Sequence, residues 1–419
     1  MKFRLTAILA AAAAVLGLAN QAFAQQPPGT DQTIGQHFEI TADSLPGPYA
    51  EPSRNNPPRQ VARGESIPIV PEGFTVTLYA EGLANPRRLA VLADGTVLLV
   101  QQALGRVVKL RDIDGNGAAD QLGLVAEGLL EPFGIAEVPV GPWQGDLLIA
   151  DADAVYRLSI VSGGFEPTQV TPDGAFGVAQ GHITRELEVD PKTGALYIGI
   201  GSIANLGEEP APKATIQRFD ADGANQATFA SGLRNPTGLG FDPATGALYA
   251  VVMERDGMGD RLVPDFFSKV DEGDFFGWPY QYTGGFVQPE LADQAPKVAA
   301  AKMPSVLFEA HSAPMDLVFL PPSWPEGFAG TAIAALKGSS NRGEATGYKL
   351  VHILFADGAP TGAYENFATN FWVAGGDADS RPQVWGRPAA LAIMPDGGLL
   401  VADDFGGTLW KIMPPPKAE

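Results

Sequence analysis

One short pattern recurs along this chain: an apolar strand, a turn rich in Asp, Gly or Pro, and a second apolar strand. Clear copies read PRRLAVLADGTVLLV, TRELEVDPKTGALYIGI and PTGLGFDPATGALYAVV, starting at residues 86, 184 and 236. Asp-Gly and Thr-Gly supply the positive φ angles that tight hairpins need. No window keeps the i, i+3, i+4 apolar stripe of a helix for long, so the pattern predicts strand pairs.

The strand pair occurs six times, and successive copies lie about 45 to 80 residues apart, which is the kind of spacing found in β-propellers. We therefore predict an all-β chain folded as a six-bladed β-propeller with four-stranded antiparallel blades. The longer spacings place insertions at 254–310 and 337–386. The first apolar anchors of the six copies are Leu89, Ile135, Leu187, Leu239, Leu317 and Leu391.

Each copy shows only two of the four strands that a blade requires. Segments such as 105–110, 214–219 and 408–412 can supply outer strands. Residues 74–79, FTVTLY, alternate in polarity ahead of the first copy and are predicted to complete the last blade beside 408–412. Such ring closure removes sheet edges that would otherwise template aggregation.

The ends of the chain are predicted to lie outside the propeller. Residues 1–24 combine a charged start, an apolar run and the small-x-small sequence Ala22-Phe23-Ala24, which is typical of a secretory signal peptide. Residues 25–70 are predicted to be an extended, Pro-rich and loosely held segment. The propeller then covers 71–413, and 414–419 form a tail. The chain is expected to be periplasmic or secreted.

Composition excludes several classes of function. The net charge of −20 makes nucleic acid and anionic lipid poor partners. The chain has no cysteine, which excludes disulfides and a covalent c-type haem. No run after the leader is long and apolar enough to span a bilayer, so no membrane span is predicted.

The segment before each first strand, here called a lead segment, concentrates basic residues in this acidic chain. First strands line the axis of a propeller, so the six lead segments should meet at one mouth of the channel. A single His or Arg in such a place is usually structural, and His311 alone fits that interpretation. Several basic residues, however, occupy the same position relative to the repeat, and together they predict a cationic pocket for an anionic ligand or cofactor. The residues concerned are Arg87, Arg88, His182, Arg185, Arg234, His311 and Arg387.

Five phrases of the chain resemble the soluble sugar dehydrogenase and L-sorbosone dehydrogenase family, whose members are six-bladed propellers that use pyrroloquinoline quinone (PQQ). The resemblance covers about 71 to 412, and its strength comes from the order and blade phase of the phrases. They are GHITREL (181–187), GLRNPTGLGFDP (232–243), MERDGMGDRLVPDFFSKVDEGDFFGWPY (253–280), LKGSSNRGEATGYK (336–349) and WGRPAALAIMPDGGLLVADD (385–404).

The resemblance implies roles for individual residues. His182 matches the family's general base, and an imidazole suits that task. Arg234 matches the arginine that contacts the quinone oxygens, where a fixed guanidinium stabilises growing negative charge. The same resemblance implies further contacts with PQQ. These come from Asn235, Lys337 and Arg387, with Arg88, Arg185 and Arg342 as looser candidates.

Two segments are candidates for calcium, a cation that prefers oxygen ligands. The loop 254–260 resembles the family's calcium loop, where backbone carbonyls hold the metal, and this places the ion at Asp256 and Gly257. The second segment, DIDGNGAAD, has the spacing of an EF-hand-like loop but lacks the final bidentate Glu, so a plain Asp/Gly turn is an equal alternative. Its candidate ligands are Asp112, Asp114, Asn116 and Asp120.

The chain departs from glucose-oxidising members of the family at Ser202, where those members carry an Asp that orients the catalytic histidine. The leading hypothesis is a PQQ- and calcium-dependent dehydrogenase of a sugar, a sorbosone-like sugar aldehyde or a polyol. Because the chain has no haem motif, its electrons must pass to an external acceptor, either a quinone or a cytochrome. The alternatives are a calcium-dependent lactonase and a non-catalytic carbohydrate-binding propeller.

Overall fold

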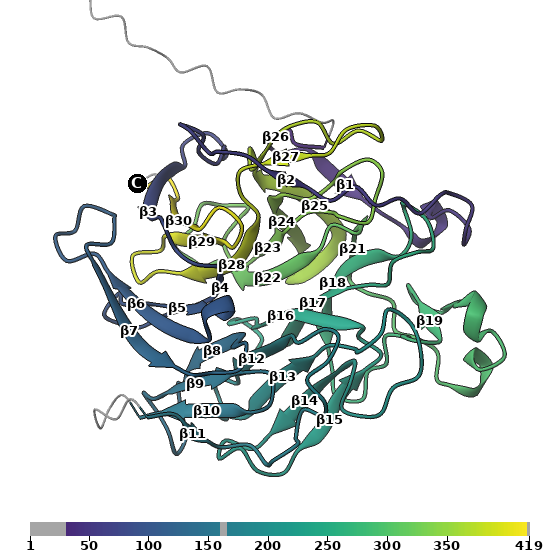
Figure 1. Cartoon of the computed structure of the whole chain (residues 1–419), viewed down its shortest axis with the longest axis horizontal. Coiled ribbons are helices and arrows are strands. Elements are labelled where there is room, and N and C mark those ends of the chain that lie inside the picture. Colours follow the sequence, from purple (N-terminus) through teal and green to yellow (C-terminus); the bar gives the residue numbers. More distant parts are fainter. Residues whose placement is uncertain (1–30, 160–165, 417–419) are drawn as a thin grey trace, which may run out of the picture.

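The structure is a computed structural model that describes residues 31–159 and 166–416, and its regular elements are almost all β-strands (Figure 1). The predicted signal peptide, 1–24, lies outside the described residues. Among the described residues, no helix is long and apolar enough to cross a membrane.

Within the described residues, six antiparallel sheets that each include a run of four strands follow one another along the chain, and in the first five of them these four strands are in chain order. The first three sheets are β4 (Pro86–Val91), β5 (Val97–Gln101), β6 (Arg106–Arg111) and β7 (Gln121–Glu127); β8 (Gly134–Glu137), β9 (Leu147–Ala150), β10 (Val155–Leu158) and β11 (Thr168–Gln169); and β12 (Arg185–Val189), β13 (Leu196–Ile200), β14 (Thr215–Phe219) and β15 (Ala227–Ser231).

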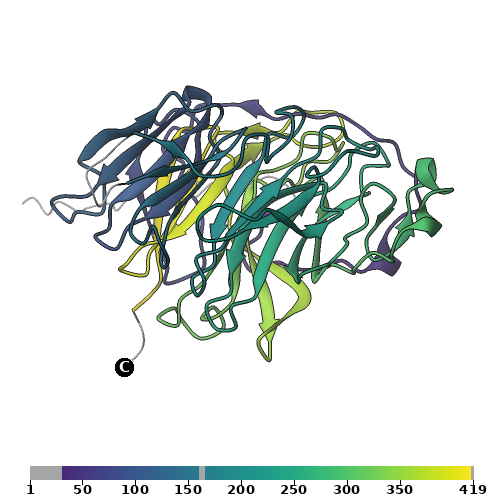
Figure 2. The same cartoon turned by 90° about the horizontal axis from the view of Figure 1, so that it is seen from below.

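The last three sheets repeat the arrangement with longer connections. They are β16 (Asn235–Phe241), β17 (Leu248–Met253), β18 (Pro264–Val270) and β21 (Val306–Ala310); β22 (Pro314–Phe319), β23 (Ala332–Leu336), β24 (Lys349–Ala356) and β25 (Ala359–Ala368); and β28 (Pro388–Ile393), β29 (Leu399–Asp403), β30 (Thr408–Met413) and β3 (Thr75–Ala80). The β24–β25 hairpin is the longest and projects from the body (Figure 2).

The first strands of the six sheets contact one another in a closed cycle. In chain order β4, β8, β12, β16, β22 and β28 each contact the next, and β28 returns to β4, so these strands surround a common axis (Figure 1). The predicted all-β class with four-stranded antiparallel sheets is confirmed, and the cyclic contacts are consistent with a propeller. All six predicted apolar anchors lie within these first strands.

The ring is closed by a strand from the beginning of the chain. β3 pairs with β30, setting Val76 opposite Ile412 and Leu78 opposite Trp410. This confirms the predicted pairing of 74–79 with 408–412. The segments predicted as outer strands at 105–110 and 214–219 are β6 and β14.

The second strand of each sheet is apolar along most of its length, because both of its faces are covered by neighbouring sheets. β5, β13 and β23 have every residue buried. Continuous apolar runs of this kind, rather than alternating ones, mark strands that are packed on both faces. The hydrophobic cores accordingly lie between adjacent sheets rather than in one central mass.

The two windows predicted as insertions, 254–310 and 337–386, contain strands of the four-stranded sheets themselves as well as added segments. The window 254–310 includes outer strands β18 and β21, and 337–386 includes β24 and β25. The genuine additions are β19 (Gln281–Tyr282), β20 (Phe286–Val287), η3 (Pro289–Leu291) and η4 (Ala295–Lys297), and also β26 (Trp372–Ala374) and β27 (Gln383–Val384). A further short turn, η2 (Gln102–Leu104), follows β5.

The N-terminal segment is extended, as predicted, but it is not loosely held. β1 (His37–Glu39) adds a fifth strand beside β25, and β2 (Arg59–Gln60) pairs with β27, with η1 (Ala42–Ser44) between them. The polar composition that suggested a loose segment instead supplies hydrogen bonds to the body. The Asn56 side chain, for example, donates to the carbonyl of Gly343 at 2.9 Å.

An ion cluster crosses the axis just inside the ring of first strands. Arg88 on β4 pairs with Glu186 on β12, and its Nη1 lies 2.7 Å from Oδ2 of Asp316 on β22. All three side chains are nearly inaccessible to solvent. Burial raises the pKa of both carboxyl groups, and the Arg88 charge opposes that rise. The cluster therefore links three alternate sheets through one guanidinium.

Replacing Arg88 with Met should destabilise the protein strongly, because it leaves Glu186 and Asp316 buried without a counter-ion. Removing one partner of a buried pair costs about 3–5 kcal/mol in the free energy of unfolding. The matched control is Arg111→Met, whose exposed partner Asp94 lies 3.6 Å away and which should cost under about 1 kcal/mol. Urea unfolding measures both, and equal losses would contradict the role of the cluster.

Candidate functional site

The candidate site lies at one end of the ring, where two sets of chain segments converge. Because each sheet is antiparallel, the start of its first strand and the end of its second strand lie at the same end. A cavity here is lined from the third to the sixth sheets. Its walls comprise His182, Arg234, Met253, Glu254, Asp256, Asp265, His311, Ala313, Gly338, Ser340, Asn341 and Arg387.

His182 is held by the residue that ends the second strand of its own sheet. Its Nδ1 lies 2.9 Å from the Ser202 carbonyl and 3.1 Å from Ser202 Oγ. Because Ser202 Oγ donates its own proton to the Ala204 carbonyl at 2.7 Å, the Nδ1 hydrogen is directed to the Ser202 oxygens. This fixes the tautomer that carries hydrogen on Nδ1 and leaves Nε2 free of a proton.

The surroundings keep the His182 imidazole neutral. Burial lowers its pKa, the positive charge of Arg234 lowers it further, and the Ser202 carbonyl and Asp256 oppose these effects, leaving the pKa at about 4. At neutral pH the ring is therefore a proton acceptor at Nε2. A peptide carbonyl orients the ring here, and it stabilises the imidazolium less strongly than a carboxylate would.

Arg234 is fixed at the start of β16 by acceptors on three segments. Its Nη1 donates to the Glu254 carbonyl at 2.8 Å, and its Nη2 donates to Asn205 Oδ1 at 3.0 Å. Its carboxylate partner is Asp256, whose Oδ2 is 3.7 Å away. Burial lowers the pKa of Arg234, and the nearby acidic groups only partly restore it. The guanidinium is thus rigid, desolvated and incompletely neutralised.

A second basic cluster surrounds Asp404, which follows β29. Lys337 Nζ lies 2.8 Å from Asp404 Oδ2, and Arg87 Nη1 reaches the same oxygen at 2.5 Å. Arg387 donates to the carbonyls of Lys337 and Gly338. Burial lowers the pKa of Lys337 to about 8, and burial also lowers the pKa of Arg387. The Asp404 carboxylate thus pairs with two cations, Arg87 and Lys337, while Arg387 lies beside Asp403, whose Oδ1 accepts the Arg387 backbone N–H at 2.6 Å.

Asp256 lies between the two histidine-bearing segments, where it faces basic groups. Its Oδ1 is 3.1 Å from Nδ1 of His311, whose Nε2 contacts the Gly259 carbonyl at 3.0 Å. Burial alone would raise the pKa of Asp256, but His311 and Arg234 hold it below its usual value. His311, which alone fitted a structural interpretation, therefore contributes to the cavity wall.

The structure brings together only part of the predicted set. His182, Arg234, Arg387 and Asp256 line the cavity, and Lys337 adjoins Arg387. Asn235 is buried at the start of β16, where its Oδ1 has no hydrogen-bond partner and its Nδ2 contacts Met253 Sδ at 3.8 Å.

Three of the looser candidates lie elsewhere. Arg88 is deeper on the axis in the ion cluster with Glu186 and Asp316. Arg342 follows the cavity residues Ser340 and Asn341, but its side chain turns outward to Glu309 and the Ala310 carbonyl. Neighbouring or distant sheets supply carboxylate acceptors for both guanidiniums, which the sequence alone did not reveal. We do not retain either as a cofactor contact.

Arg185 lies immediately behind His182 rather than in the cavity wall. It is fully buried, and its Nη1 donates to the carbonyls of Thr184 and His182 at 2.6 and 3.3 Å. Burial lowers its pKa to about 10. Arg185 therefore supports the segment that carries His182 by binding its backbone carbonyls.

The two calcium candidates differ in geometry. The Asp256 carbonyl already accepts from Asn205 Nδ2 at 2.9 Å and Arg255 Nε at 3.2 Å, and its carboxylate faces cations, so Asp256 does not fit a metal ligand here. Gly257, which has φ of +89°, adjoins it.

The loop between β6 and β7 does gather three of its four candidate ligands. Carboxylate oxygens of Asp112, Asp114 and Asp120 lie within 4.8 Å of one another, whereas Asn116 directs its amide nitrogen to Asp114. The same oxygens accept backbone N–H groups of the loop, including Gly117 at 2.8 Å. Antiparallel order places this loop at the opposite end of the ring from the cavity.

Sequence reasoning singled out Ser202, Lys337 and the loop that begins at Glu254, but it missed Gln102, Asp151 and Asp404, which lie at the same place just after a second strand. It considered the lead segments at the mouth, although antiparallel pairing brings the second-strand ends there as well. The signal was available as the residue after each copy's second apolar run. The residues found this way are Gln102, Asp151, Ser202, Glu254, Lys337 and Asp404.

The cavity fits an anionic ligand with hydrogen-bond acceptors. Arg234, Lys337 and Arg387 are all buried or partly buried cations whose pKa values are lowered by loss of water. A bound anion would restore the lost charge stabilisation. Burial also raises the pKa of Glu254 to about 8, so this cavity residue adds no negative charge at neutral pH. Asp256, whose pKa is lowered, and Asp265, whose pKa is raised to about 6, do carry negative charge there and partly balance the cations. The donor set therefore suits a carboxylate-bearing quinone such as PQQ.

Ser202→Asp should raise the pKa of His182, because a carboxylate beside Nδ1 stabilises the imidazolium. The measurement is NMR titration of the imidazole signals, with His182→Gln assigning the signal. We expect the wild-type ring to protonate near pH 4 and the variant at least about one unit higher. Ser202→Ala is the control and should change the pKa little, because the carbonyl acceptor remains. Identical titrations for all three proteins would contradict this arrangement.

Solved structures with the same fold carry names of PQQ enzymes. A holo pyranose dehydrogenase PQQ domain from Coprinopsis cinerea aligns with a TM-score of 0.67 at 20% identity, covering 85% of this chain and 99% of that one. A PQQ-bound aldose sugar dehydrogenase from Streptomyces coelicolor aligns with a TM-score of 0.55 at 17% identity, covering 82% and 100%. These likenesses show the fold.

Two proteins are similar to this chain in sequence over most of its length. An uncharacterised protein of Borreliella burgdorferi is 26% identical over 360 residues, covering 82% of this chain and 90% of that protein. A pyrroloquinoline quinone-dependent pyranose dehydrogenase of Coprinopsis cinerea is 24% identical over 335 residues. That alignment covers 67% of this chain and 44% of the relative, so the chain spans under half of that enzyme's length.

The family assignment rests on a match along most of the chain. Residues 68–264 and 281–414 fit the model of the TrAA12-like family, and a calcium-containing solved structure from Trichoderma reesei is named as a member of carbohydrate-active enzyme family AA12. The resemblance to the soluble PQQ-dependent sugar dehydrogenases is confirmed at this level. The chain belongs to the TrAA12-like family.

Proposed function

We propose that this protein is a PQQ-dependent dehydrogenase, built on a six-bladed β-propeller, that oxidises a sugar, a sorbosone-like sugar aldehyde or a polyol. One observation carries the proposal. The neutral His182 imidazole lines the same cavity as two guanidiniums, that of the buried Arg234 and that of the partly buried Arg387. A proton acceptor beside fixed, desolvated positive charge suits oxidation of a hydroxyl group.

Bound PQQ would supply an ortho-quinone as hydride acceptor and carboxylates as anchors. Among the residues of this chain, Arg387 and Lys337 would hold carboxylates, since both are partly buried cations with lowered pKa values. Arg234 and Asn235, which are consecutive at the start of β16, would face the quinone oxygens. The unpartnered Asn235 Oδ1 and the incompletely neutralised Arg234 leave both side chains with capacity for a ligand.

His182 would receive the hydroxyl proton at Nε2. Its Nδ1–H remains on the Ser202 carbonyl, so the ring keeps its orientation when Nε2 is protonated. Arg234 lowers the pKa of His182 and thereby keeps it unprotonated before reaction. The fixed Arg234 charge also favours a state with developed negative charge over a neutral ground state.

The finer features of the proposal come from the sequence and the family. Calcium is proposed as a second cofactor, with Gly257 and the loop 112–120 as the remaining places for it. An external quinone or cytochrome is proposed as electron acceptor, because the chain has no cysteine for a covalent haem. The protein is proposed to be exported to the periplasm or beyond through the leader at 1–24.

The decisive experiment starts from purified protein without cofactor. PQQ is added with or without calcium, and binding is followed by visible absorbance while dye-linked oxidation is measured across aldoses, sugar aldehydes and polyols. PQQ binding with turnover supports the proposal. Lactone hydrolysis with calcium alone would instead identify a lactonase, and sugar binding without either activity would identify a binding propeller.

His182→Ala should abolish most oxidation while leaving PQQ binding nearly intact, because the imidazole accepts a proton and does not neutralise the cofactor. Loss of a general base typically costs about 10²- to 10⁴-fold in rate. The control is His37→Ala, an exposed histidine on β1 whose loss should leave kcat unchanged. Normal turnover by the His182 variant would exclude it as the base.

Arg387→Met should weaken PQQ binding by at least about tenfold, the effect of losing one charge-assisted contact. Arg218→Met removes an exposed arginine of the third sheet and serves as the control. Fluorescence or absorbance titration with PQQ gives both dissociation constants. Equal affinities for the two variants would remove Arg387 from the cofactor site.

A further inference from the structure

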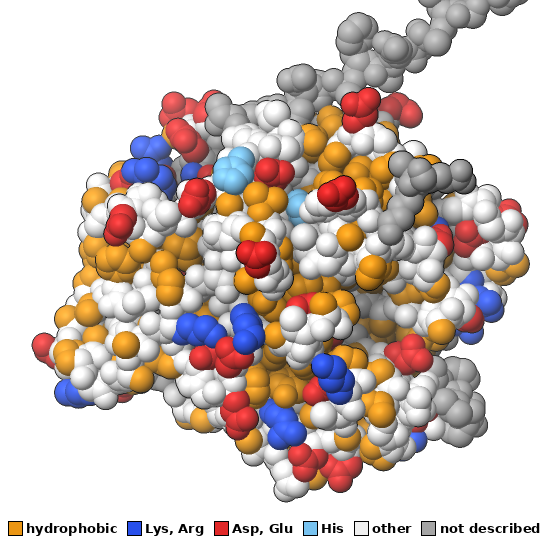
Figure 3. Space-filling view, turned by 180° about the vertical axis from the view of Figure 1, so that it is seen from behind, with side chains coloured by type: hydrophobic (Ala, Val, Ile, Leu, Met, Phe, Trp, Pro, Cys, Tyr) orange, Lys and Arg blue, Asp and Glu red, His pale blue; other side chains and the backbone are white. Residues whose placement is uncertain are grey.

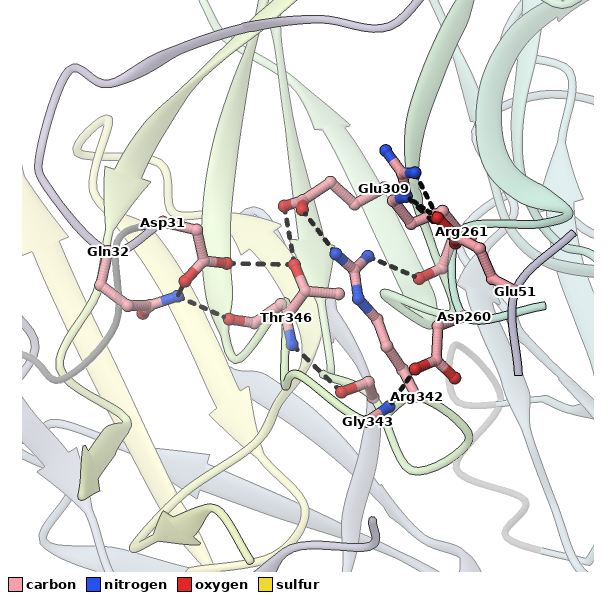
Figure 4. Close-up of polar contacts among 12 residues, drawn as sticks. Asp31, Gln32, Glu51, Asp260, Arg261, Glu309, Arg342, Gly343 and Thr346 are labelled. Carbon is pink, nitrogen blue, oxygen red and sulfur yellow. Dashed lines mark hydrogen bonds and ion pairs between the residues drawn. The ribbon is translucent and has the colours of Figure 1, made fainter. Parts of the chain in front are cut away.

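The N-terminal segment passes directly over the loops that form one side of the cavity. Residues 31–60, here called the strap, contact loop 256–261 of the fourth sheet and loop 338–347 of the fifth. Figure 4 shows this junction, with Asp31 and Gln32 reaching Thr346 and Gly347 at one end and Glu51 pairing with Arg261 at the other. The strap is therefore a structural partner of both loops.

Asn56 makes the most specific contact between the strap and the cavity wall. Its side chain is 8% exposed, and its backbone N–H donates to the Ser340 carbonyl at 2.8 Å. Its Nδ2 donates to the Gly343 carbonyl at 2.9 Å. These two bonds fix the backbone at 340 and at 343, on either side of residues 341 and 342. Further bonds from Nδ2 reach the carbonyls of Asp377 and Ser380 at 3.0 and 3.1 Å.

The enclosed stretch belongs to the cavity. Ser340 and Asn341 line it, and the Gly338 carbonyl two residues earlier accepts from Arg387. Asn341 also contributes a hydrogen bond that lowers the pKa of Asp256. A change in the position of this stretch would therefore alter the cavity wall directly.

Asp260 joins the two loops at the same junction. Its Oδ1 accepts from the Arg54 backbone N–H at 2.9 Å, and its Oδ2 accepts from the Gly343 N–H at 3.0 Å (Figure 4). A Cβ on Gly343 would lie 2.6 Å from Arg54 Cδ and 2.7 Å from Asp260 Oδ2. A side chain at 343 would therefore have to displace the Arg54 side chain and the Asp260 carboxylate at this junction.

We infer that Asn56 is a positioning residue, which fixes loop 338–343 through Ser340 and Gly343 and so sets the cavity wall that contacts the sugar substrate. This role in the reaction rests on the proposed function, whereas the effect on the loop does not. The strap acts as part of the site although it lies far from it in sequence and outside the ring of sheets.

Hydrogen–deuterium exchange on the full chain tests the effect on the loop. Asn56→Ala should speed amide exchange within 338–347 at least about fivefold, because each lost hydrogen bond contributes about 1 kcal/mol to closure. Asn366→Ala is the matched control. It is also a buried Asn that donates to strap carbonyls, those of Asp31 and Thr33 at 2.7 and 2.9 Å, but it does not touch residues 338–343.

Faster exchange in the Asn56 variant, confined to 338–347 and to the segment 376–380, which Asn56 also contacts, supports the inference. Unchanged exchange, an equal rise in the control, or a uniform rise over all sheets would overturn it. Gly343→Ala provides a second route if Asn56→Ala does not fold. It should loosen the same stretch from the opposite side of the junction, and failure to do so would also count against the inference.

Kinetics test the role in the reaction. Asn56→Ala should raise KM for the best sugar at least about threefold while kcat stays within about twofold, because His182 and Arg234 are untouched. A fall in kcat with constant KM would contradict a role in substrate positioning. If the wild-type protein neither binds PQQ nor oxidises sugars, the proposed function fails, yet the exchange result still decides whether Asn56 fixes the loop.

Discussion

The ion cluster of Arg88, Glu186 and Asp316 is the constraint on which the rest of the structure depends. Six sheets can form a ring only if their first strands meet at the axis, and that meeting buries polar groups away from water. One guanidinium held by carboxylates from two other sheets satisfies this requirement. A buried charge of this kind is specific rather than generally stabilising, because it permits only one relative placement of the three strands. The cavity lies directly above this fixed layer.

Sequence periodicity predicted the fold well because the repeating strand pairs are the parts most shaped by burial. The six copies, the outer strands and the closing strand at 74–79 were all recognisable from apolar pattern and turn chemistry. Insertions were harder, since β24 and β25 differ in length from the other outer strands and do not repeat. The strap was misjudged because a polar, Pro-rich composition does not distinguish a mobile segment from one whose polar groups are bonded to the body.

The site was predicted less completely than the fold, and Arg88 and Arg342 show why. Phase along the repeat placed Arg88 near the mouth, and the family resemblance suggested Arg342, but neither could show which guanidinium already had a carboxylate partner. Arg88 meets two acids from distant sheets, and Arg342 meets Glu309. Pairing across sheets depends on three-dimensional neighbours that a single sequence does not reveal. His182 and Arg234 were accessible to sequence reasoning because both strand-end positions and family phrases pointed to them.

The closing strand β3 has a consequence for biogenesis. The sixth sheet contains residues from both the beginning and the end of the chain, so it cannot be completed until synthesis has reached β30. Arg387 and Asp404 flank strands of that sheet, and the lead segment carrying Arg87 follows β3. The binding chamber is therefore finished only after 408–413 has been synthesised and has paired with β3, about 330 residues earlier in the chain.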